Sequence, residues 1–368
     1  MFSRFAVSVF IFLATLGTVS AQDSILPGKL AVYYGYPSLV NGANGNLNAA
    51  ATVFSNYDIV VFGNSLQFPQ SYSDHPEQNH YAGCDQNSHY DHNNTVGIIA
   101  RLNNVGTKVY GYISIGGENT ASLCGPLSID EIKEHVDDWA AMGVAGIFLD
   151  EAEYGFGCSR ERQNKVVDYV HRKRLSVFIN AWNPDEVFGA YRVGKIIYTT
   201  GELNGRLSTI AMNPKGTKAH LGGNDIYLLE SYQIVTGNYE DPEVWWTRSD
   251  STLNYKNKFG THVATVTTPT ESKEFDSIID QAKFDYAWWS TFLYGFDYMG
   301  WGEANGFSSW GPYANTLLDH MRPNPGDIGD NIIPFEILHS GNFHTRTTTK
   351  GTIAIDSDSH TGEYTPAE

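Results

Sequence analysis

Short apolar runs alternate along the chain with longer stretches of helical periodicity. The runs are rich in β-branched and aromatic residues, as the buried strands of parallel sheets are. Eight of them occur, at Leu30–Tyr36, Ile59–Phe62, Val109–Ile115, Ala145–Leu149, Val177–Asn180, Ile226–Glu230, His262–Thr267 and Tyr298–Trp301. Helices are predicted between them at Asn94–Val105, Ile129–Met142, Ser159–Arg172, Asp241–Phe259 and Phe275–Leu293. Strands that alternate with helices predict an α/β fold, and eight such units predict a closed (β/α)8 TIM barrel.

Three stretches depart from this alternation. Gln67–His92 is rich in Ser, Asn, Asp and His, which predicts a long loop after the second strand. Within Tyr191–Gly223, two apolar segments flank a Gly-containing turn at residues 201–205, and this predicts an inserted β-hairpin between strands five and six. After the barrel, Pro, Gly, Asp, Ser and Thr become frequent. We therefore expect residues 323–368 to form a loosely ordered C-terminal extension.

The first 21 residues have the three parts of a secretory signal peptide. Arg4 supplies a positive charge, Phe5–Leu16 is a short apolar core, and Val19-Ser20-Ala21 is a cleavage-type ending. The apolar core is too short to cross a membrane, and no second long apolar segment follows it. We therefore expect a secreted or cell-surface protein without a membrane span, whose barrel domain occupies residues 28–322.

The charge balance narrows the range of partners. The 368 residues include 41 acidic and 24 basic side chains, for a formal net charge of −17. Nucleic acids require clustered Lys and Arg, so this balance argues against a nucleic-acid partner. It is compatible with a polycationic partner such as an amino-sugar polymer. Aromatic residues make up 13% of the chain, and both sugar-binding sites and large cores use them. Nothing in the sequence indicates an oligomeric state.

The cysteines and histidines do not predict a metal site. Cys84, Cys124 and Cys158 are too few for a disulfide scaffold, and each follows a predicted strand. We expect one bridge and one free thiol, and we favour Cys124–Cys158 because both follow neighbouring strands. The histidines of the long loop match no compact metal-binding spacing; they are His75, His80, His89 and His92. We expect neither a metal nor another cofactor.

Two of the predicted strands end in carboxylates. The fourth is followed directly by Asp150 and Glu151, and the sixth ends in Glu230. Barrel enzymes keep their catalytic groups at the C-terminal ends of the strands, and glycoside hydrolysis needs two carboxyl groups around the scissile bond. Because side chains alternate along a strand, Asp150 would face the barrel mouth above Phe148 and Gly146. The competing interpretation is that these acids only cap the helices that follow.

Polar and aromatic residues follow other strands and could line the same mouth. Tyr and Trp faces stack on sugar rings, and side-chain amides hold hydroxyl or acetamido groups. Each such residue alone is more often a packing residue, so the pattern counts only as a set. The candidate substrate-binding residues are Tyr34, Tyr36, Tyr112, Asn180, Trp182, Trp301 and Glu303.

These residues resemble those of a known family. Gly146-Ile147-Phe148-Leu149-Asp150-Glu151, with Glu230 at the end of the sixth strand, resembles the spherulin-4 family of glycoside hydrolases and the related endo-α-1,4-polygalactosaminidases. The resemblance runs from about Lys29 to Met321. It implies a (β/α)8 barrel that acts on α-1,4-linked galactosamine or N-acetylgalactosamine polymers, with Asp150, Glu151 and Glu230 as its functional acids. The chain departs from the pattern at Ala145, where Asp is frequent, and in its two long insertions.

Two functions from different classes fit these observations. The first is a secreted, endo-acting glycosidase in which Asp150 is the charged partner and Glu230 the proton donor. The second is a non-catalytic barrel protein of the cell surface or matrix, which binds glycan or serves a structural role. Buried, mutually repelling acids favour the enzyme, because a binding protein has no need of them.

Overall fold

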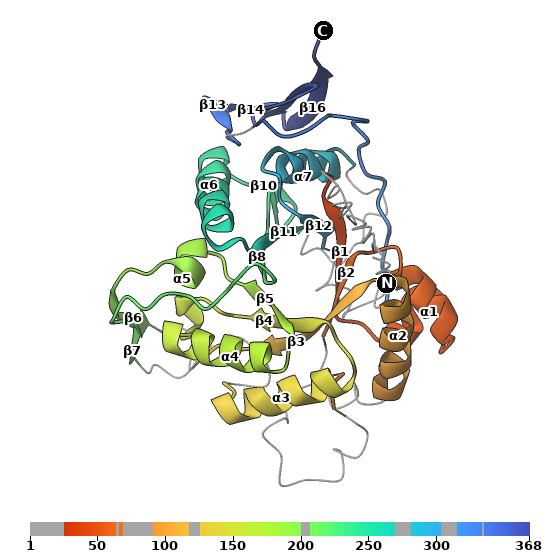
Figure 1. The fold of residues 1–368 in the computed structure, drawn as a ribbon, viewed down its shortest axis with the longest axis vertical. Helices are drawn as coiled ribbons and strands as arrows, with labels where there is room; N and C mark the ends of the chain where they lie inside the picture. The colour runs from red at the N-terminus through yellow and green to blue at the C-terminus, as the bar shows by residue number, and fades with distance from the viewer. Residues whose placement is uncertain are drawn as a thin grey trace, which may run out of the picture.

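Eight parallel strands close into a barrel, with helices packed around it (Figure 1). The computed structural model describes residues 26–63, 66–68, 91–117, 126–199, 207–268, 281–302, 315–332 and 335–368, without the side chains of 194–199 and 207–211. In pairing order the strands are β1 (Gly28–Tyr33), β12 (Tyr298–Trp301), β11 (His262–Thr267), β8 (Ile226–Glu230), β5 (Ser176–Asn180), β4 (Gly146–Asp150), β3 (Lys108–Ser114) and β2 (Ile59–Phe62). β1 pairs with both β12 and β2, which closes the barrel. The (β/α)8 prediction and all eight predicted strands are confirmed.

The longer helices begin and end close to their predicted positions. They are α2 (His92–Val105), α3 (Ile129–Ala141), α4 (Arg160–Arg172), α6 (Pro242–Phe259) and α7 (Gln281–Leu293), while residues 275–280 lie outside the described ranges. Ser128 and Glu131 form a reciprocal capping box at the start of α3. Two further helices, α1 (Leu47–Phe54) and α5 (Pro184–Phe188), were not predicted. Their N-caps Asn46 and Asn183 accept backbone hydrogen bonds, but the helices are too short to show a helical period.

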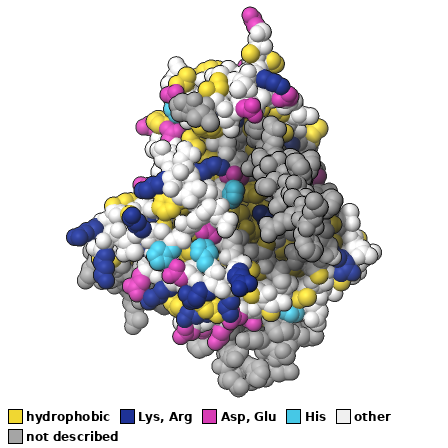
Figure 2. Space-filling view, viewed as in Figure 1, with side chains coloured by type: hydrophobic (Ala, Val, Ile, Leu, Met, Phe, Trp, Pro, Cys, Tyr) yellow, Lys and Arg dark blue, Asp and Glu magenta, His cyan; other side chains and the backbone are white. Residues whose placement is uncertain are grey.

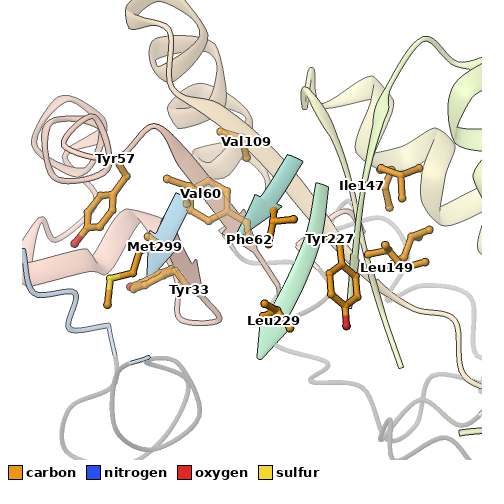
Figure 3. Close-up of a cluster of buried hydrophobic side chains, with 14 of the residues drawn as sticks. Tyr33, Tyr57, Val60, Phe62, Val109, Ile147, Leu149, Tyr227, Leu229 and Met299 are labelled. Carbon is orange, nitrogen blue, oxygen red and sulfur yellow. The ribbon is translucent and has the colours of Figure 1, made fainter. Parts of the chain in front are cut away.

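Alternating side chains on the barrel strands divide the core into two parts. The inward-facing set fills the barrel and consists of Leu30, Val32, Ile59, Val61, Tyr110, Phe148, Phe178, Ile226, Leu228, Ala264 and Val266. The outward-facing set packs beneath the helices, and Figure 3 shows some of its members. On β4, Phe148 belongs to the inner set whereas Ile147 and Leu149 belong to the outer one. The same period of two directs Asp150 inward, as predicted.

The insertion between the fifth and sixth barrel strands is a β-hairpin, as predicted. Its strands β6 (Val193–Thr199) and β7 (Leu207–Asn213) pair antiparallel. The hairpin lies at the edge of the molecule beside α4 (Figure 1). A second, two-residue ribbon follows β8 and consists of β9 (Ile234–Val235) and β10 (Asn238–Tyr239). Short 3-10 segments occur at η1 (Pro37–Gly42), which is kinked at Val40 and Asn41, and at η5 (Tyr154–Phe156).

The C-terminal extension is folded, and our expectation of a loosely ordered segment was wrong. Four strands, β13 (Leu338–Ser340), β14 (Phe343–Thr348), β15 (Gly351–Asp356) and β16 (Thr361–Pro366), form an antiparallel sheet that packs on α7 (Figure 1). Ile353 and Ile355 are fully buried, and Arg346 donates a hydrogen bond to the Phe292 carbonyl in the last turn of α7. The composition of this segment gave the wrong prediction because its Thr-rich strands look polar. The aromatic surface on which they pack belongs to α7, a helix distant in the sequence.

The face shown in Figure 2 carries charges of both signs. Basic and acidic side chains are interspersed in the part of this view where α3 and α4 lie. Lys173, at the end of α4, pairs with Asp137 on α3 at 2.6 Å, and Lys165 pairs with Glu161 within α4 at 2.7 Å. Exposed pairs of this kind contribute at most about 1 kcal/mol each, so packing dominates the attachment of these helices.

Several predictions concern residues outside the described ranges. These are the signal peptide, most of the Gln67–His92 loop, and two of the three cysteines, Cys84 and Cys124. Cys158 is buried and has a free thiol, so the favoured Cys124–Cys158 bridge is not present in the structure. A bridge between Cys84 and Cys124 lies outside the described ranges and stays a prediction. Among the helices that the structure describes, none combines the length and apolar character needed to cross a membrane.

The folded extension makes a testable difference to stability. Replacing Ile353 by Ala should lower the free energy of unfolding by about 2–4 kcal/mol, because it leaves a cavity in the core cluster. Leu338→Ala is the matched control; this side chain is 58% exposed, and its loss should change stability by less than about 0.5 kcal/mol. Both are measured by urea unfolding of the full chain. Equally small effects of the two substitutions would mean that the sheet does not pack on the barrel domain.

Candidate active site

The two strand-end carboxylates lie at the same rim of the barrel. Asp150 is the last residue of β4 and Glu230 is the last residue of β8. Only β5 separates these strands, and it ends in Asn180. Because parallel strands end at one rim, inward-pointing side chains at these positions meet at the barrel mouth. The predicted common location of Asp150 and Glu230 is therefore confirmed.

The side-chain amide of Asn180 joins the two carboxylates. Its Nδ2 donates to Asp150 Oδ1 at 2.8 Å and to Glu230 Oε2 at 2.7 Å. The two oxygens can be no farther apart than the sum of these distances, 5.5 Å. Only the NH2 end of an amide can donate to two carboxylates, so the network defines its orientation. The amide oxygen of Asn180 is buried and has no hydrogen-bond partner among the described residues.

Each oxygen of the Asp150 carboxylate accepts a hydrogen bond. Asn180 donates to Oδ1, and the Tyr112 hydroxyl donates to Oδ2 at 2.9 Å. The Tyr112 ring is stacked on Phe148, with centroids 5.9 Å apart, and makes an edge contact with Tyr34 at 5.3 Å. Packing therefore fixes the position of the donating hydroxyl. The two hydrogen bonds therefore hold the Asp150 carboxyl group in one orientation at the barrel mouth.

Tyr34 completes the aromatic side of the mouth. Burial, followed by repulsion from Asp150 and Glu230, raises the pKa of its hydroxyl well above the ordinary value, so the phenol stays neutral. Gly63, just after β2, leaves room for the ring, because a Cβ atom there would lie 2.4 Å from Tyr34 Cδ1. A larger residue at position 63 would displace Tyr34 from the site.

Glu230 is in a different environment from Asp150. Burial is the main cause that raises its pKa to about 7, and repulsion by Asp150 adds to it. The hydrogen bond from Asn180 and the charge of Arg248 act in the opposite direction but are weaker. At neutral pH Glu230 therefore exchanges a proton readily. Two carboxyl groups whose environments differ in this way can divide acid and base roles.

The chain turns sharply after each carboxylate. Glu151 has φ +55° and Ser231 has φ +53°, a left-handed conformation that residues other than Gly rarely adopt. Glu151 is buried, and its Oε2 accepts a hydrogen bond from Ser114 Oγ at 2.5 Å. Ser114 is paired with Asp150 in the β3–β4 register. Glu151 thus secures the strained turn behind Asp150, which is a supporting role.

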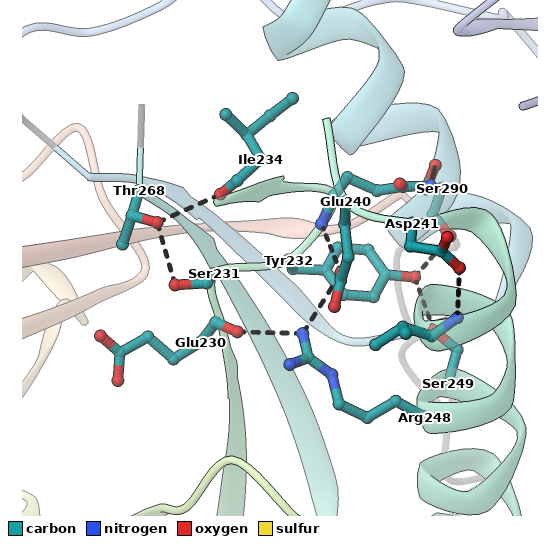
Figure 4. A network of polar contacts seen from close by, with 12 residues as sticks. Glu230, Ser231, Tyr232, Ile234, Glu240, Asp241, Arg248, Ser249, Thr268 and Ser290 are labelled. Carbon is teal, nitrogen blue, oxygen red and sulfur yellow. Dashed lines mark hydrogen bonds and ion pairs between the residues drawn. The ribbon is translucent and has the colours of Figure 1, made fainter. Parts of the chain in front are cut away.

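A buried Arg–Glu pair supports the backbone at Glu230 (Figure 4). Arg248 of α6 donates from Nη2 to the Glu230 carbonyl at 3.0 Å and lies 3.5 Å from Glu240 Oε2. Its guanidinium lies 3.9 Å from the centroid of the Trp182 ring. Sequence reasoning missed both Arg248 and Glu240. They occupy ordinary positions in a helix and a loop, and no local pattern marks them.

Trp182 and Glu153 extend the mouth away from the Asp150–Glu230 pair. The Trp182 backbone N–H donates to Glu153 Oε2 at 2.8 Å. Burial raises the pKa of Glu153, and the nearby Asp150 and Glu151 raise it further, although the Trp182 hydrogen bond opposes this. Glu153 was also missed as a site residue. Acidic groups therefore predominate at this rim.

Three predicted binding residues are not shown at this mouth. The Trp301 ring points outward from β12 and packs on Phe284 and His320, at centroid distances of 5.6 and 5.7 Å. Tyr36 packs in the same outer cluster. Both placements were wrong, because Trp301 falls on the outer side of the strand alternation and β1 ends before Tyr36. Glu303 lies outside the described residues. Tyr34, Tyr112, Asn180 and Trp182 are at or beside the site.

No group of three or more His, Cys, Asp or Glu side chains could hold a metal ion in the part of the chain that the structure describes. His92 has its Nδ1 atom 2.8 Å from the Leu66 carbonyl oxygen, which anchors the end of the long loop. His75, His80 and His89 lie outside the described ranges.

Solved structures with a similar fold are known. The α-amylase of Anoxybacillus has a TM-score of 0.51 at 9% identity, over 90% of this chain and 87% of that one. Eubacterium rectale Amy13B follows with 0.49 at 9% identity, over 89% and 85%. The endoglucanase Cel5A of Pseudomonas stutzeri has 0.41 at 12% identity, over 81% and 89%. The sequence matches no protein-family model and no curated protein. At such low identity the likeness to the amylase establishes the barrel fold alone, which hosts many unrelated activities.

The raised pKa of Glu230 predicts a pH-dependent gain in stability on its removal. The pKa of about 7 lies above the ordinary 4.5, so the folded protein holds this proton more tightly than the unfolded chain. The cost of ionising Glu230 is absent below about pH 4, grows as the pH rises, and is complete above about pH 7. Glu230→Gln should therefore match the wild type at pH 4 and be more stable by about 1–3 kcal/mol at pH 8.

Urea unfolding at the two pH values measures this difference. Glu243→Gln, which changes an exposed acid on α6, is the control and should show no such pH-dependent gain. A Glu230→Gln variant with the same stability difference at pH 4 and pH 8 would contradict the raised pKa.

Proposed function

We propose that this chain is a secreted glycoside hydrolase that cuts within an amino-sugar polysaccharide through Asp150 and Glu230. The observation that carries the proposal is the carboxylate pair bridged by Asn180. Asp150 accepts a hydrogen bond at each of its carboxyl oxygens, and Glu230 has a pKa of about 7. Such a pair supplies the nucleophile and the proton donor that glycosidic cleavage needs.

The geometry supports a two-step route with retention of configuration. Protonated Glu230 gives its proton to the glycosidic oxygen while the Asp150 carboxylate attacks the anomeric carbon, so that the glycosidic bond breaks and a glycosyl ester forms. Ionised Glu230 then accepts a proton from water, whose oxygen displaces Asp150. Inverting pairs need about 6.5–9.5 Å between the carboxyl groups to admit a water, whereas retaining pairs need about 5–5.5 Å. The Asn180-bound oxygens of the two carboxyl groups lie no more than 5.5 Å apart, which is compatible with the second arrangement.

The substrate class is proposed from charge and from resemblance. Asp150, Glu151, Glu153 and Glu230 gather at one rim, and Arg248 offsets only part of their charge. An amino-sugar polymer carries ammonium groups that complement this rim. The resemblance of the fourth- and sixth-strand motifs to endo-α-1,4-polygalactosaminidases points to α-1,4-galactosaminidic linkages. Secretion is proposed from the pattern of residues 1–21.

Conservative replacement of the two acids tests the catalytic assignment. Asp150→Asn and Glu230→Gln should each lower turnover of a galactosamine-containing polymer by at least about 10²-fold, the low end for losing a general acid or base. Both variants should fold and still bind the polymer. Glu161→Gln, an exposed acid on α4, is the control and should keep wild-type turnover.

Near-normal turnover in either variant would show that other carboxylates act. A wild-type protein that binds the polymer but cleaves no member of an amino-sugar panel would favour the non-catalytic glycan-binding protein.

The stereochemistry of the product tests the two-step route. Proton NMR of the first product formed should show the anomeric configuration of the bond that was cut. The opposite anomer would rule out a glycosyl–Asp150 intermediate, while leaving the carboxylate pair as the site of cleavage.

A further inference from the structure

A groove of about 550 Å³ lies beside the active site, between the start of α5 and the first half of α6. Its volume is within the range of small-ligand sites in proteins. Trp182 lines one side of it, and Arg248 lies at its inner end. The remaining lining includes two acids, Asp185 and Glu243, and the exposed Val244. The groove therefore combines an aromatic surface, an aliphatic surface and negative charge.

The groove is continuous with the catalytic site through shared residues. Arg248 lines it and also donates to the Glu230 carbonyl. Trp182 lies two residues beyond Asn180 and is tied through its backbone to Glu153. A chain bound across the carboxylate pair would meet Trp182 as it leaves the barrel mouth on the β5 side.

The Trp182 ring is a supported and accessible surface. It is 42% exposed, which is unusual for so large an apolar side chain, although its backbone is anchored. The Arg248 guanidinium lies 3.9 Å from the ring centroid, and Arg248 itself is held by Glu230 and Glu240. This cation–π contact orients the indole before any ligand arrives. A flat, pre-oriented indole is suited to stack on the apolar face of a sugar ring.

The acids of the groove select for a cation. Asp185 Oδ1 accepts hydrogen bonds from Tyr255 at 2.7 Å and from Ser251 at 3.4 Å, so its carboxylate is fixed in place. Glu243 is an exposed acid in the first turn of α6. The one basic residue that lines the groove, Arg248, is already engaged with Glu240 and Glu230. A neutral sugar would leave these carboxylates without a counter-charge, whereas an ammonium group would supply one.

We propose that this groove is a distal subsite that binds a hexosamine unit with a free amino group, away from the bond that is cut. Trp182 stacks on the ring, and Asp185 and Glu243 attract the ammonium group. This inference rests on the proposed function, because the unit belongs to the polymer held at Asp150 and Glu230. It implies that the protein prefers long, de-N-acetylated chains to short or fully acetylated ones.

Chain length and acetylation provide the test. Purified full-length protein is assayed on galactosaminan polymers and on trisaccharides, each in a de-N-acetylated and an N-acetylated form. Trp182→Ala should lower kcat/KM about tenfold more on the long chains than on the trisaccharides. A tenfold effect corresponds to the loss of about 1.4 kcal/mol of stacking energy. Trp182→Phe should recover most of this difference.

The charge of the groove is tested separately. Glu243→Gln should weaken binding of the de-N-acetylated polymer by about threefold at low salt, should do less at high salt, and should leave the acetylated polymer unaffected. Glu161→Gln is the matched control, because it removes an acid from the first turn of α4, away from the groove. Binding is measured with the Glu230→Gln variant, so that cleavage does not interfere.

The outcomes separate the subsite from the proposed activity. An equal loss on long and short substrates in Trp182→Ala, or an equal effect of Glu243→Gln on both polymers, would overturn the subsite while leaving the enzyme intact. A wild-type protein that binds the polymer in a Trp182-dependent way without cleaving it would overturn the activity and keep the groove. A protein that neither cleaves nor binds these polymers would overturn both.

Discussion

Repulsion between two carboxylates governs the arrangement of this barrel rim. Asp150 and Glu230 end strands that only β5 separates, and the closed barrel brings them nearer than like charges would otherwise lie. Asn180 offsets part of the repulsion by donating to both. Burial, together with the repulsion that remains, raises the pKa of Glu230 to about 7. The fold thereby keeps a carboxyl group with an exchangeable proton beside a second acid, at a cost to its own stability.

The polar rim stands on a rigid aromatic floor. Inside the barrel, Phe178 makes edge contacts with Phe148 and with Tyr110, at centroid distances of 5.1 and 5.5 Å. Phe148 in turn stacks under Tyr112, which holds Asp150. Interiors packed in this way allow little rearrangement. The carboxylates therefore cannot relieve their repulsion by moving apart, and protonation of Glu230 is the remaining response.

Helix α6 connects this rim to the C-terminal sheet. On its inner side Arg248 donates to the Glu230 carbonyl. On another side Asp250 lies 3.3 Å from His339, and the Trp246 ring contacts the same His339 of β13. The sheet thus packs against the helix that holds the end of β8. An extension that looked dispensable by composition contributes to the support of Glu230, although it lies outside the barrel.

Local patterns were sufficient to predict the eight strands, the hairpin and the common rim of Asp150 and Glu230, because a period of two and parallel pairing determine where strand ends point. The same reasoning from strand ends also predicted four residues at or beside the site, which are Tyr34, Tyr112, Asn180 and Trp182. The rule failed for Tyr36, where the strand ends early, and for Trp301, which faces outward. The shared amide, the turned Glu151 and the Arg248–Glu240 pair emerged only on folding. The shared amide and the turned Glu151 depend on contacts between different strands, and the Arg248–Glu240 pair depends on the packing of α6 against the loop before it. These contacts, like the packing of the C-terminal sheet on α7, leave no mark on the local sequence.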